Sequence, residues 1–255
     1  MVAIGVAGKG GTGKTTLAAL IVCALLRAGN KPVLAVDADP NSTLSDALGV
    51  EQPRSIVQIT DEVARIRDSL PPGMDKAQYL EFRVRDAIRE SEGFDLLLMG
   101  RTEGPGCYCA ANHILRECLD KLQHNYAFVV MDNEAGLEHL SRRTTRNLDI
   151  LFITSQITRS SARSVENILS VGRNLDLSIR HTCLVLNEYG SATRAPSKEI
   201  NFPLPPAFCL PFDSEVLERS EEGKGLLDIP DDSPACAAVR KNLFALLSGF
   251  GLLAR

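Results

Sequence analysis

The 255-residue sequence lacks a strong excess of charge of either sign. Its 28 Lys and Arg residues are matched by 32 Asp and Glu residues, which gives a net charge of −4. Proteins that bind nucleic acid through their overall charge are generally basic. We therefore expect no nucleic-acid partner.

The sequence also lacks an apolar run of the roughly 20 residues that a transmembrane helix needs. The apolar residues 2–7 are only strand-length and pass directly into a glycine-rich turn, unlike a secretory signal. Residues 243–254 are apolar but carry almost no Lys or Arg, so they lack the basic face of a membrane-surface helix. We expect a cytoplasmic protein with no membrane partner.

Seven cysteines in a chain of this kind do not indicate a disulfide framework. Cys23, Cys183 and Cys209 lie among apolar residues of expected helices or strands, and we expect them to be buried. Cys107 and Cys109 have a different setting, which is described below.

Strand-like apolar segments alternate with helical or polar segments along the chain, and this alternation predicts an α/β fold with a doubly wound, mostly parallel sheet. The length suits one domain over residues 1–255. The polar stretch of about 51–91 predicts a helical insertion with a loop at Pro71-Pro72-Gly73. Strands are expected at residues 2–7, 33–37, 96–100, 128–132, 150–154, 182–186 and 207–210.

A glycine-rich turn between an expected strand and an expected helix is the most informative segment. Glycines let backbone N–H groups surround phosphates, and the helix N-terminus adds partial positive charge. Lys14 would reach the β- and γ-phosphates, and the Thr15 hydroxyl would bind Mg²⁺. The order predicts a P-loop for a nucleoside triphosphate, formed by Gly8, Lys9, Gly10, Gly11, Thr12, Gly13, Lys14, Thr15 and Thr16.

Lys9 adds a cation that an ordinary phosphate loop does not need. With this lysine the loop resembles the deviant Walker A motif of the nitrogenase iron protein and MinD/ParA superclass. The resemblance implies a homodimer that encloses ATP, in which Lys9 acts on the partner's nucleotide.

Carboxylates follow the second expected strand, in Asp37-Ala38-Asp39-Pro40. They should lie at the edge of the sheet where open α/β folds bind ligands. In the same superclass the matching Asp-x-Asp-Pro is switch I, so the resemblance implies that Asp39 polarises the attacking water and that Asp37 supports the Mg²⁺ shell. Helix capping by both aspartates is the alternative interpretation.

The expected strand 128–132 ends in an aspartate, as a Walker B strand does. Asp132 would hold Mg²⁺ through water. Gly136 would let the backbone approach the γ-phosphate as switch II. The order of the three motifs predicts a Mg²⁺-dependent ATPase.

Two residues further along are candidates for contacts with the base. Asn187 ends an expected strand, and its amide can both donate to and accept from adenine, although Asn is also a common turn residue. Pro211 lies in Leu210-Pro211-Phe212-Asp213, which resembles the base-side loop of the superclass. The preference for ATP over GTP is implied by the resemblance alone.

Cys107 and Cys109 are two residues apart, so in extended backbone both sulfurs project to one face. Two thiolates do not complete a tetrahedral zinc site, but a two-fold dimer would supply the other pair. Soft thiolates favour zinc, copper(I) or iron–sulfur centres, and a planar set could hold Ni²⁺.

Three blocks together resemble the CooC-like ATPases that insert nickel into carbon monoxide dehydrogenase: the phosphate loop, the Gly106–Cys109 segment and residues 132–140. The resemblance implies that Cys107 and Cys109 bind Ni²⁺ or Zn²⁺ between two subunits. It also implies a nickel-enzyme client, either carbon monoxide dehydrogenase or acetyl-CoA synthase. His113 is more typical of a helix surface than of an extra ligand, and His139 could couple the nucleotide to the interface.

Two alternatives are weaker on the residues. An ATP-driven electron donor would bridge a [4Fe–4S] cluster between subunits, but its cysteines are expected on separate loops. A positioning ATPase of the ParA/MinD kind has no use for Cys-x-Cys.

Overall fold

The structure is a computed structural model that describes residues 1–66, 70–101, 125–134, 147–174, 177–187 and 200–253. Within these residues, eight strands form one sheet in the order β3-β4-β2-β5-β1-β6-β7-β8. All neighbouring strands are parallel except β3 and β4. The strands are β1 (Val2–Gly8), β2 (Val33–Ala38), β3 (Arg89–Ser91), β4 (Phe94–Leu98), β5 (Phe128–Asn133), β6 (Asn147–Gln156), β7 (Ser178–Asn187) and β8 (Pro206–Leu210).

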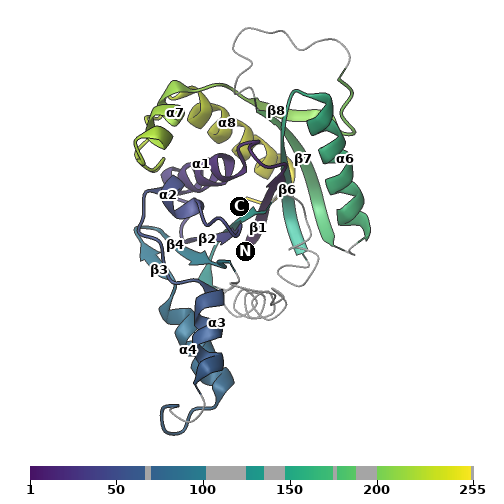
Figure 1. Cartoon of the computed structure of the whole chain (residues 1–255). Coiled ribbons are helices and arrows are strands. Elements are labelled where there is room, and N and C mark those ends of the chain that lie inside the picture. The colour runs from purple at the N-terminus through teal and green to yellow at the C-terminus, as the bar shows by residue number, and fades with distance from the viewer. Residues whose placement is uncertain (67–69, 102–124, 135–146, 175–176, 188–199, 254–255) are drawn as a thin grey trace.

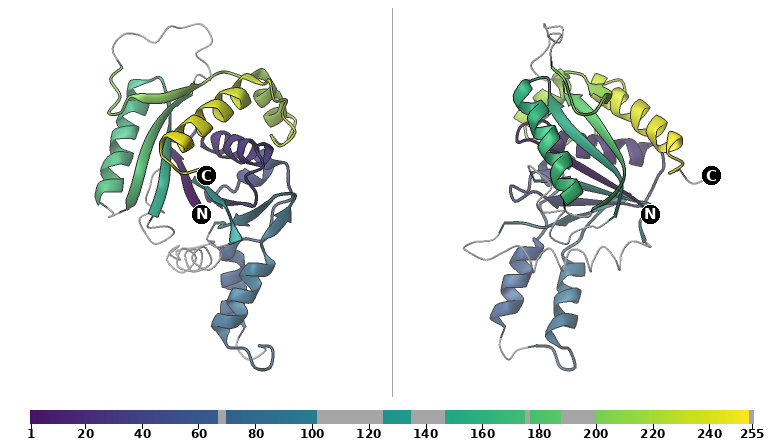
Figure 2. Two further views of the ribbon diagram at one scale, coloured as in Figure 1. Left: turned by 180° about the vertical axis from the view of Figure 1, so that it is seen from behind. Right: turned by 90° about the vertical axis from the view of Figure 1, so that its right-hand side faces the viewer.

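Helices cover both faces of the sheet (Figures 1 and 2). The described helices are α1 (Lys14–Arg27), α2 (Leu44–Leu48), α3 (Ile56–Arg65), α4 (Lys76–Asp86), α6 (Arg159–Asn174), α7 (Ser214–Glu221) and α8 (Pro234–Gly249). One apolar core lies between the sheet and α1, α2 and α8, and a second lies between the sheet and α3, α4 and α6. The predicted doubly wound, mostly parallel α/β sheet is confirmed.

Strand β1 shows how the sequence divides between the two cores. Ile4 and Val6 lie in the core beneath α1, whereas Ala3 and Ala7 lie in the opposite core. Side chains alternate between the faces of a strand, so a strand buried on both faces reads as a continuous apolar run. This burial explains why the apolar segments of the central strands β1, β2 and β5 are found as strands.

Strand β3 was not predicted. It contains Arg89, Glu90 and Ser91 and has no apolar signal. It pairs with β4 as an antiparallel hairpin through a tight turn in which Gly93 has φ +83°. The polar stretch before it contains α3 and α4, which extend together from one end of the sheet (Figure 2). Capping boxes begin both helices, at Ser55 and at Asp75.

Two of the three apolar-segment cysteines are buried as expected, but Cys209 is exposed. It lies on β8, an edge strand with an alternating burial pattern. None of the described helices is long and apolar enough to cross a membrane.

Candidate nucleotide-binding site

The three predicted motifs meet at the carboxyl ends of three adjacent strands. Strand β5 lies between β2 and β1. Its Asp132 is directly opposite Asp37 of β2 and Val6 of β1. The phosphate loop leaves β1 just beyond Val6, so the fold brings the loop and both aspartates to one edge of the sheet, as expected for an open α/β fold.

The phosphate loop is fixed by Thr12, whose side chain is buried. Thr12 Oγ1 donates to the carbonyl oxygen of Lys9 (2.7 Å) and is 2.8 Å from Thr154 Oγ1 on β6. The loop is therefore anchored to β6 of the sheet through the Thr12 side chain. Thr154 was not identified from the sequence, because a threonine near a strand end carries no distinctive pattern.

Two glycines of the loop have no room for a side chain. Gly13 precedes α1 with φ +87°, a left-handed conformation that favours glycine, and a Cβ there would lie 2.4 Å from Asn187 Nδ2. A Cβ on Gly8 would lie 2.4 Å from Thr154 Oγ1. The close approach explains why the motif needs glycine at these two positions.

The two lysines of the loop differ in their surroundings. Lys14 is the first residue of α1 and is only 7% exposed. Lys9 is exposed, and its Nζ donates to Ser160 Oγ near the start of α6 (3.0 Å). Lys14 thus lies at the helix N-terminus, where phosphate is favoured, and Lys9 lies at the surface.

Thr15 and Asp132 form the centre of the candidate Mg²⁺ site. Thr15 Oγ1 donates to Asp132 Oδ2 (2.5 Å). Asp132 Oδ1 is buried and has no hydrogen-bond partner among the described residues. Burial raises the pKa of Asp132 to about 6, against the lowering effects of the Thr15 hydrogen bond and of Lys14.

An orphan carboxylate oxygen beside a threonine hydroxyl is an oxygen donor set of the kind that Mg²⁺ prefers. The residues present therefore fit the cation.

Asp37 is fully buried and holds the loop that follows β2. Its Oδ2 accepts from the backbone N–H of Leu44 (2.8 Å), and its Oδ1 accepts from that of Asp39 (3.1 Å). Burial raises its pKa to about 7, although the Leu44 N–H opposes the shift. Because Leu44 is the first residue of α2, the capping interpretation describes Asp37 well.

Asp39 lies in the same loop and is 8% exposed. Its Oδ1 accepts from the backbone and side-chain N–H groups of Asn41, both at 2.9 Å. This local turn fixes the Asp39 carboxylate at the same edge of the sheet as the phosphate loop.

A pocket of about 240 Å³ lies on the other side of the phosphate loop. Asn187 and Pro211 both line it, with apolar walls from Leu210 and Val216. Asn187 Nδ2 donates to the Thr12 carbonyl (3.0 Å), which joins the pocket to the loop. The two predicted base-contact residues are thus brought together.

The loop after β8 is held by Asp213, a role that sequence reasoning missed. Its Oδ1 accepts from Glu215 N–H at the start of α7, and its Oδ2 accepts from Ser233 Oγ and from Ala235 N–H at the start of α8. A buried aspartate just before a Ser-Glu helix start is an N-cap signal, so the bond to Glu215 was accessible from sequence. The bond to Ser233 depends on the tertiary fold.

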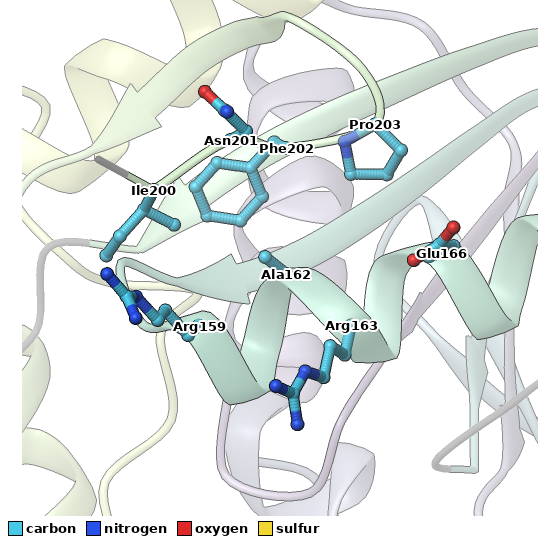
Figure 3. A pocket seen from close by; sticks show the side chains of 8 residues that line it. All are labelled: Arg159, Ala162, Arg163, Glu166, Ile200, Asn201, Phe202 and Pro203. Atoms are coloured by element: carbon cyan, nitrogen blue, oxygen red, sulfur yellow. The ribbon is translucent and has the colours of Figure 1, made fainter. Parts of the chain in front are cut away.

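Two other hollows lie outside the phosphate loop. The larger, about 1330 Å³, is lined by Pro40, Asn41 and Ser42, by α3 and by Arg101. The smaller, about 410 Å³, lies between α6 and residues 200–203, with Arg159 and Arg163 projecting from the helix (Figure 3). The smaller hollow contains none of the predicted site residues.

Five residues singled out from the sequence lie outside the described residues. They are Cys107, Cys109, His113, Gly136 and His139. In the described part of the chain, no group of three or more His, Cys, Asp or Glu side chains is arranged to hold a metal ion.

The sequence matches the family described as CobQ/CobB/MinD/ParA nucleotide binding domain over residues 4–227. The chain belongs to this family. The CobQ/CobB/MinD/ParA match confirms the predicted superclass, and with it a nucleotide-binding ATPase domain.

Curated relatives match nearly the whole chain. An ATP-binding protein of Methanocaldococcus jannaschii is 37% identical over 236 residues, which is 90% of this chain and 92% of the relative. The carbon monoxide dehydrogenase accessory protein CooC of Rhodospirillum rubrum is 30% identical over 261 residues, 96% of this chain and 95% of the relative.

Solved structures of the same family have the same fold. A ParA family ATPase from Chlorobium tepidum matches with a TM-score of 0.73 at 20% identity and covers 96% of this chain and 98% of its own. The septum site-determining protein MinD of Pyrococcus horikoshii, complexed with Mg-ADP, matches with a TM-score of 0.71 at 22% identity and covers 100% of this chain and 99% of its own.

Proposed function

We propose that the chain is a Mg²⁺-dependent ATPase that works as a homodimer in the cytoplasm and assists nickel insertion into carbon monoxide dehydrogenase or acetyl-CoA synthase. The observation that carries this proposal is the 30% identity to a carbon monoxide dehydrogenase accessory protein over 96% of the chain. The Cys-x-Cys pair in the sequence adds a metal-binding element that nucleotide binding alone does not need.

In this proposal Lys14 and the loop N–H groups bind the phosphates of ATP, and Thr15 and Asp132 hold Mg²⁺. Mg²⁺ neutralises charge that develops on the phosphates. The arrangement is supported by the Oδ1 of Asp132, which is buried and has no partner among the described residues, while Oδ2 of the same carboxylate accepts from the Thr15 hydroxyl.

Asp39 orients the water that attacks the γ-phosphate. Its carboxylate is largely buried and is fixed by two hydrogen bonds from Asn41. Lys9 acts on the nucleotide of the partner subunit, for which its surface position is suitable. Asn187 and Pro211 contact the adenine from the pocket that they line.

Ni²⁺ or Zn²⁺ is cargo, bound by Cys107 and Cys109 of both subunits. Strand β2 leads into the switch loop (residues 39–43) and contacts the segment that leads toward these cysteines: Met99 N–H donates to the carbonyl oxygen of Asp37, near the end of β2 (2.9 Å). Arg101 and the switch-loop residues 40–42 also line one hollow. A change in the switch loop on hydrolysis would therefore reach the segment that begins beyond Arg101.

Nickel titration of the reduced, chelator-stripped protein tests the proposal, with mass and metal content measured on a sizing column. We expect one Ni²⁺ per two chains, lost in the double variant Cys107→Ala and Cys109→Ala and kept in Cys209→Ala, a control at an exposed thiol. Absence of stoichiometric metal would contradict nickel insertion. A brown iron–sulfur chromophore would instead favour the electron donor.

A positioning ATPase is the second candidate, because a carboxysome-distribution protein of Synechococcus elongatus is 30% identical over 66% of this chain. It predicts ATP-dependent binding to DNA or to lipid vesicles with no metal requirement. Cosedimentation with each, with and without ATP, separates the two functions.

A further inference from the structure

The Thr43 hydroxyl does not cap the helix that it precedes. Thr43 is the N-cap residue of α2, a position where threonine commonly accepts a hydrogen bond from the first helical turn. Its side chain makes no such bond. The N–H of Leu44, the first residue of α2, donates to Asp37 Oδ2.

The Thr43 hydroxyl lies beside Thr15. The two Oγ1 atoms are 3.3 Å apart. A hydroxyl has one proton to donate, and that of Thr15 goes to Asp132 Oδ2 (2.5 Å). In the hydrogen bond between the two threonines, the Thr43 hydroxyl is therefore the donor and Thr15 Oγ1 is the acceptor.

The backbone around Thr43 is fixed by the loop itself. Ser42 N–H donates to the Asp39 carbonyl (3.0 Å), with Ser42 in the left-handed region at φ +56°. Leu44 is held by Asp37, and the Thr43 carbonyl accepts from Ala47 N–H (3.1 Å). Bonds on both sides thus hold the Thr43 side chain toward the phosphate loop.

We propose that Thr43 joins the oxygen shell of Mg²⁺, directly or through one water, and so couples the switch loop to the cation of the bound nucleotide. Mg²⁺ ligands lie 2.0–2.1 Å from the ion in octahedral geometry, so neighbouring ligand oxygens are about 3 Å apart. The 3.3 Å between Thr43 and Thr15 is close to this spacing.

A cation at Thr15 Oγ1 would compete with the Thr43 hydroxyl for the lone pairs of that oxygen. The Thr43 oxygen has lone pairs of its own, which would then be available to the cation or to one of its waters. This inference rests on the proposed ATPase function, because it assigns Thr43 a role in the same site.

The test measures the dissociation constant of a fluorescent ATP analogue, mant-ATP, in Mg²⁺ and in EDTA. We expect Thr43→Val to weaken binding in Mg²⁺ by about tenfold, the lower end of the losses seen when metal-site partners are removed. Binding in EDTA stays unchanged, and Thr43→Ser restores the wild-type value. Thr60→Val is the control, since the Thr60 hydroxyl donates within its own helix, to the Ile56 carbonyl oxygen (2.7 Å).

Equal binding of wild type and Thr43→Val in Mg²⁺ would overturn the inference. Equal weakening in Mg²⁺ and in EDTA would overturn it too, because a purely structural role affects both. These outcomes leave wild-type binding of Mg²⁺ and nucleotide intact. Failure of the wild-type protein to bind mant-ATP would instead refute the proposed function and this inference with it.

Discussion

A methyl group at Gly13 is expected to damage both the phosphate loop and the neighbouring pocket. Alanine in the left-handed conformation of Gly13 (φ +87°) costs about 1–2 kcal/mol. Its Cβ would also lie 2.4 Å from Asn187 Nδ2, so Asn187 must move. Moving it breaks the 3.0 Å bond to the Thr12 carbonyl, which contributes about 1 kcal/mol. Gly13→Ala should therefore lower the free energy of unfolding by about 2–3 kcal/mol.

Urea unfolding of the nucleotide-free protein measures this loss. Gly10→Ala is the matched control for stability, because no atom lies within 4 Å of a Cβ there, and we expect a change below about 0.5 kcal/mol. If Gly13→Ala is as stable as Gly10→Ala, neither the left-handed strain nor the contact with Asn187 exists as described. The variant should also bind mant-ATP more weakly, because Asn187 lines the pocket beside the loop.

Two further predictions concern buried carboxylates. Burial raises the pKa of Asp37 to about 7 and that of Asp132 to about 6, above the ordinary value of 3.8. Between about pH 4 and 7, these two carboxyl groups therefore bind more protons in the folded protein in EDTA than in the unfolded chain. The free energy of unfolding should fall as the pH rises through that window. Below about pH 6, Asp132→Asn should make the free energy of unfolding depend less on pH. Urea unfolding at pH 5, 6 and 7 measures this dependence, and the same dependence in the variant and in the wild type would contradict the raised pKa of Asp132. Asp213→Ala removes the bonds that start α7 and α8 and should cost about 2–3 kcal/mol in the same assay. The exposed Asp232→Ala is its control, and equal stability of the two variants would refute the role of Asp213.

The strands were predictable because the central ones are buried on both faces, which produces uninterrupted apolar runs. Strand β3 was not predicted because its residues Arg89, Glu90 and Ser91 are polar. It lies at the edge of the sheet, where pairing with one neighbouring strand through a tight turn at Gly93 is enough to form a strand. Cys209 was wrongly expected to be buried for a related reason. It belongs to the opposite edge strand, where alternate side chains face solvent although the sequence around it is apolar.

The candidate site was predictable where function depends on residue type and spacing along the chain. The fold places Lys14, Thr15, Asp37 and Asp132 at one edge of the sheet, as the motifs predicted. Thr43 could not be found in this way. Its hydroxyl reaches Thr15 only because the loop after β2 folds back, and a threonine before a helix is expected to cap it.

The register of β2 and β5 explains why these contacts depend on one another. Asp37 and Asp132 are direct neighbours across the two strands, and the Asp132 carboxylate adds to burial in raising the pKa of Asp37. A divalent cation at Asp132 reverses that local electrostatic effect and favours the charged form of both carboxyl groups. A charged Asp37 accepts more strongly from the N–H groups of Asp39 and Leu44, which lie at the two ends of the loop after β2. Cation binding at β5 is therefore expected to tighten the loop after β2 even before any contact with phosphate is made.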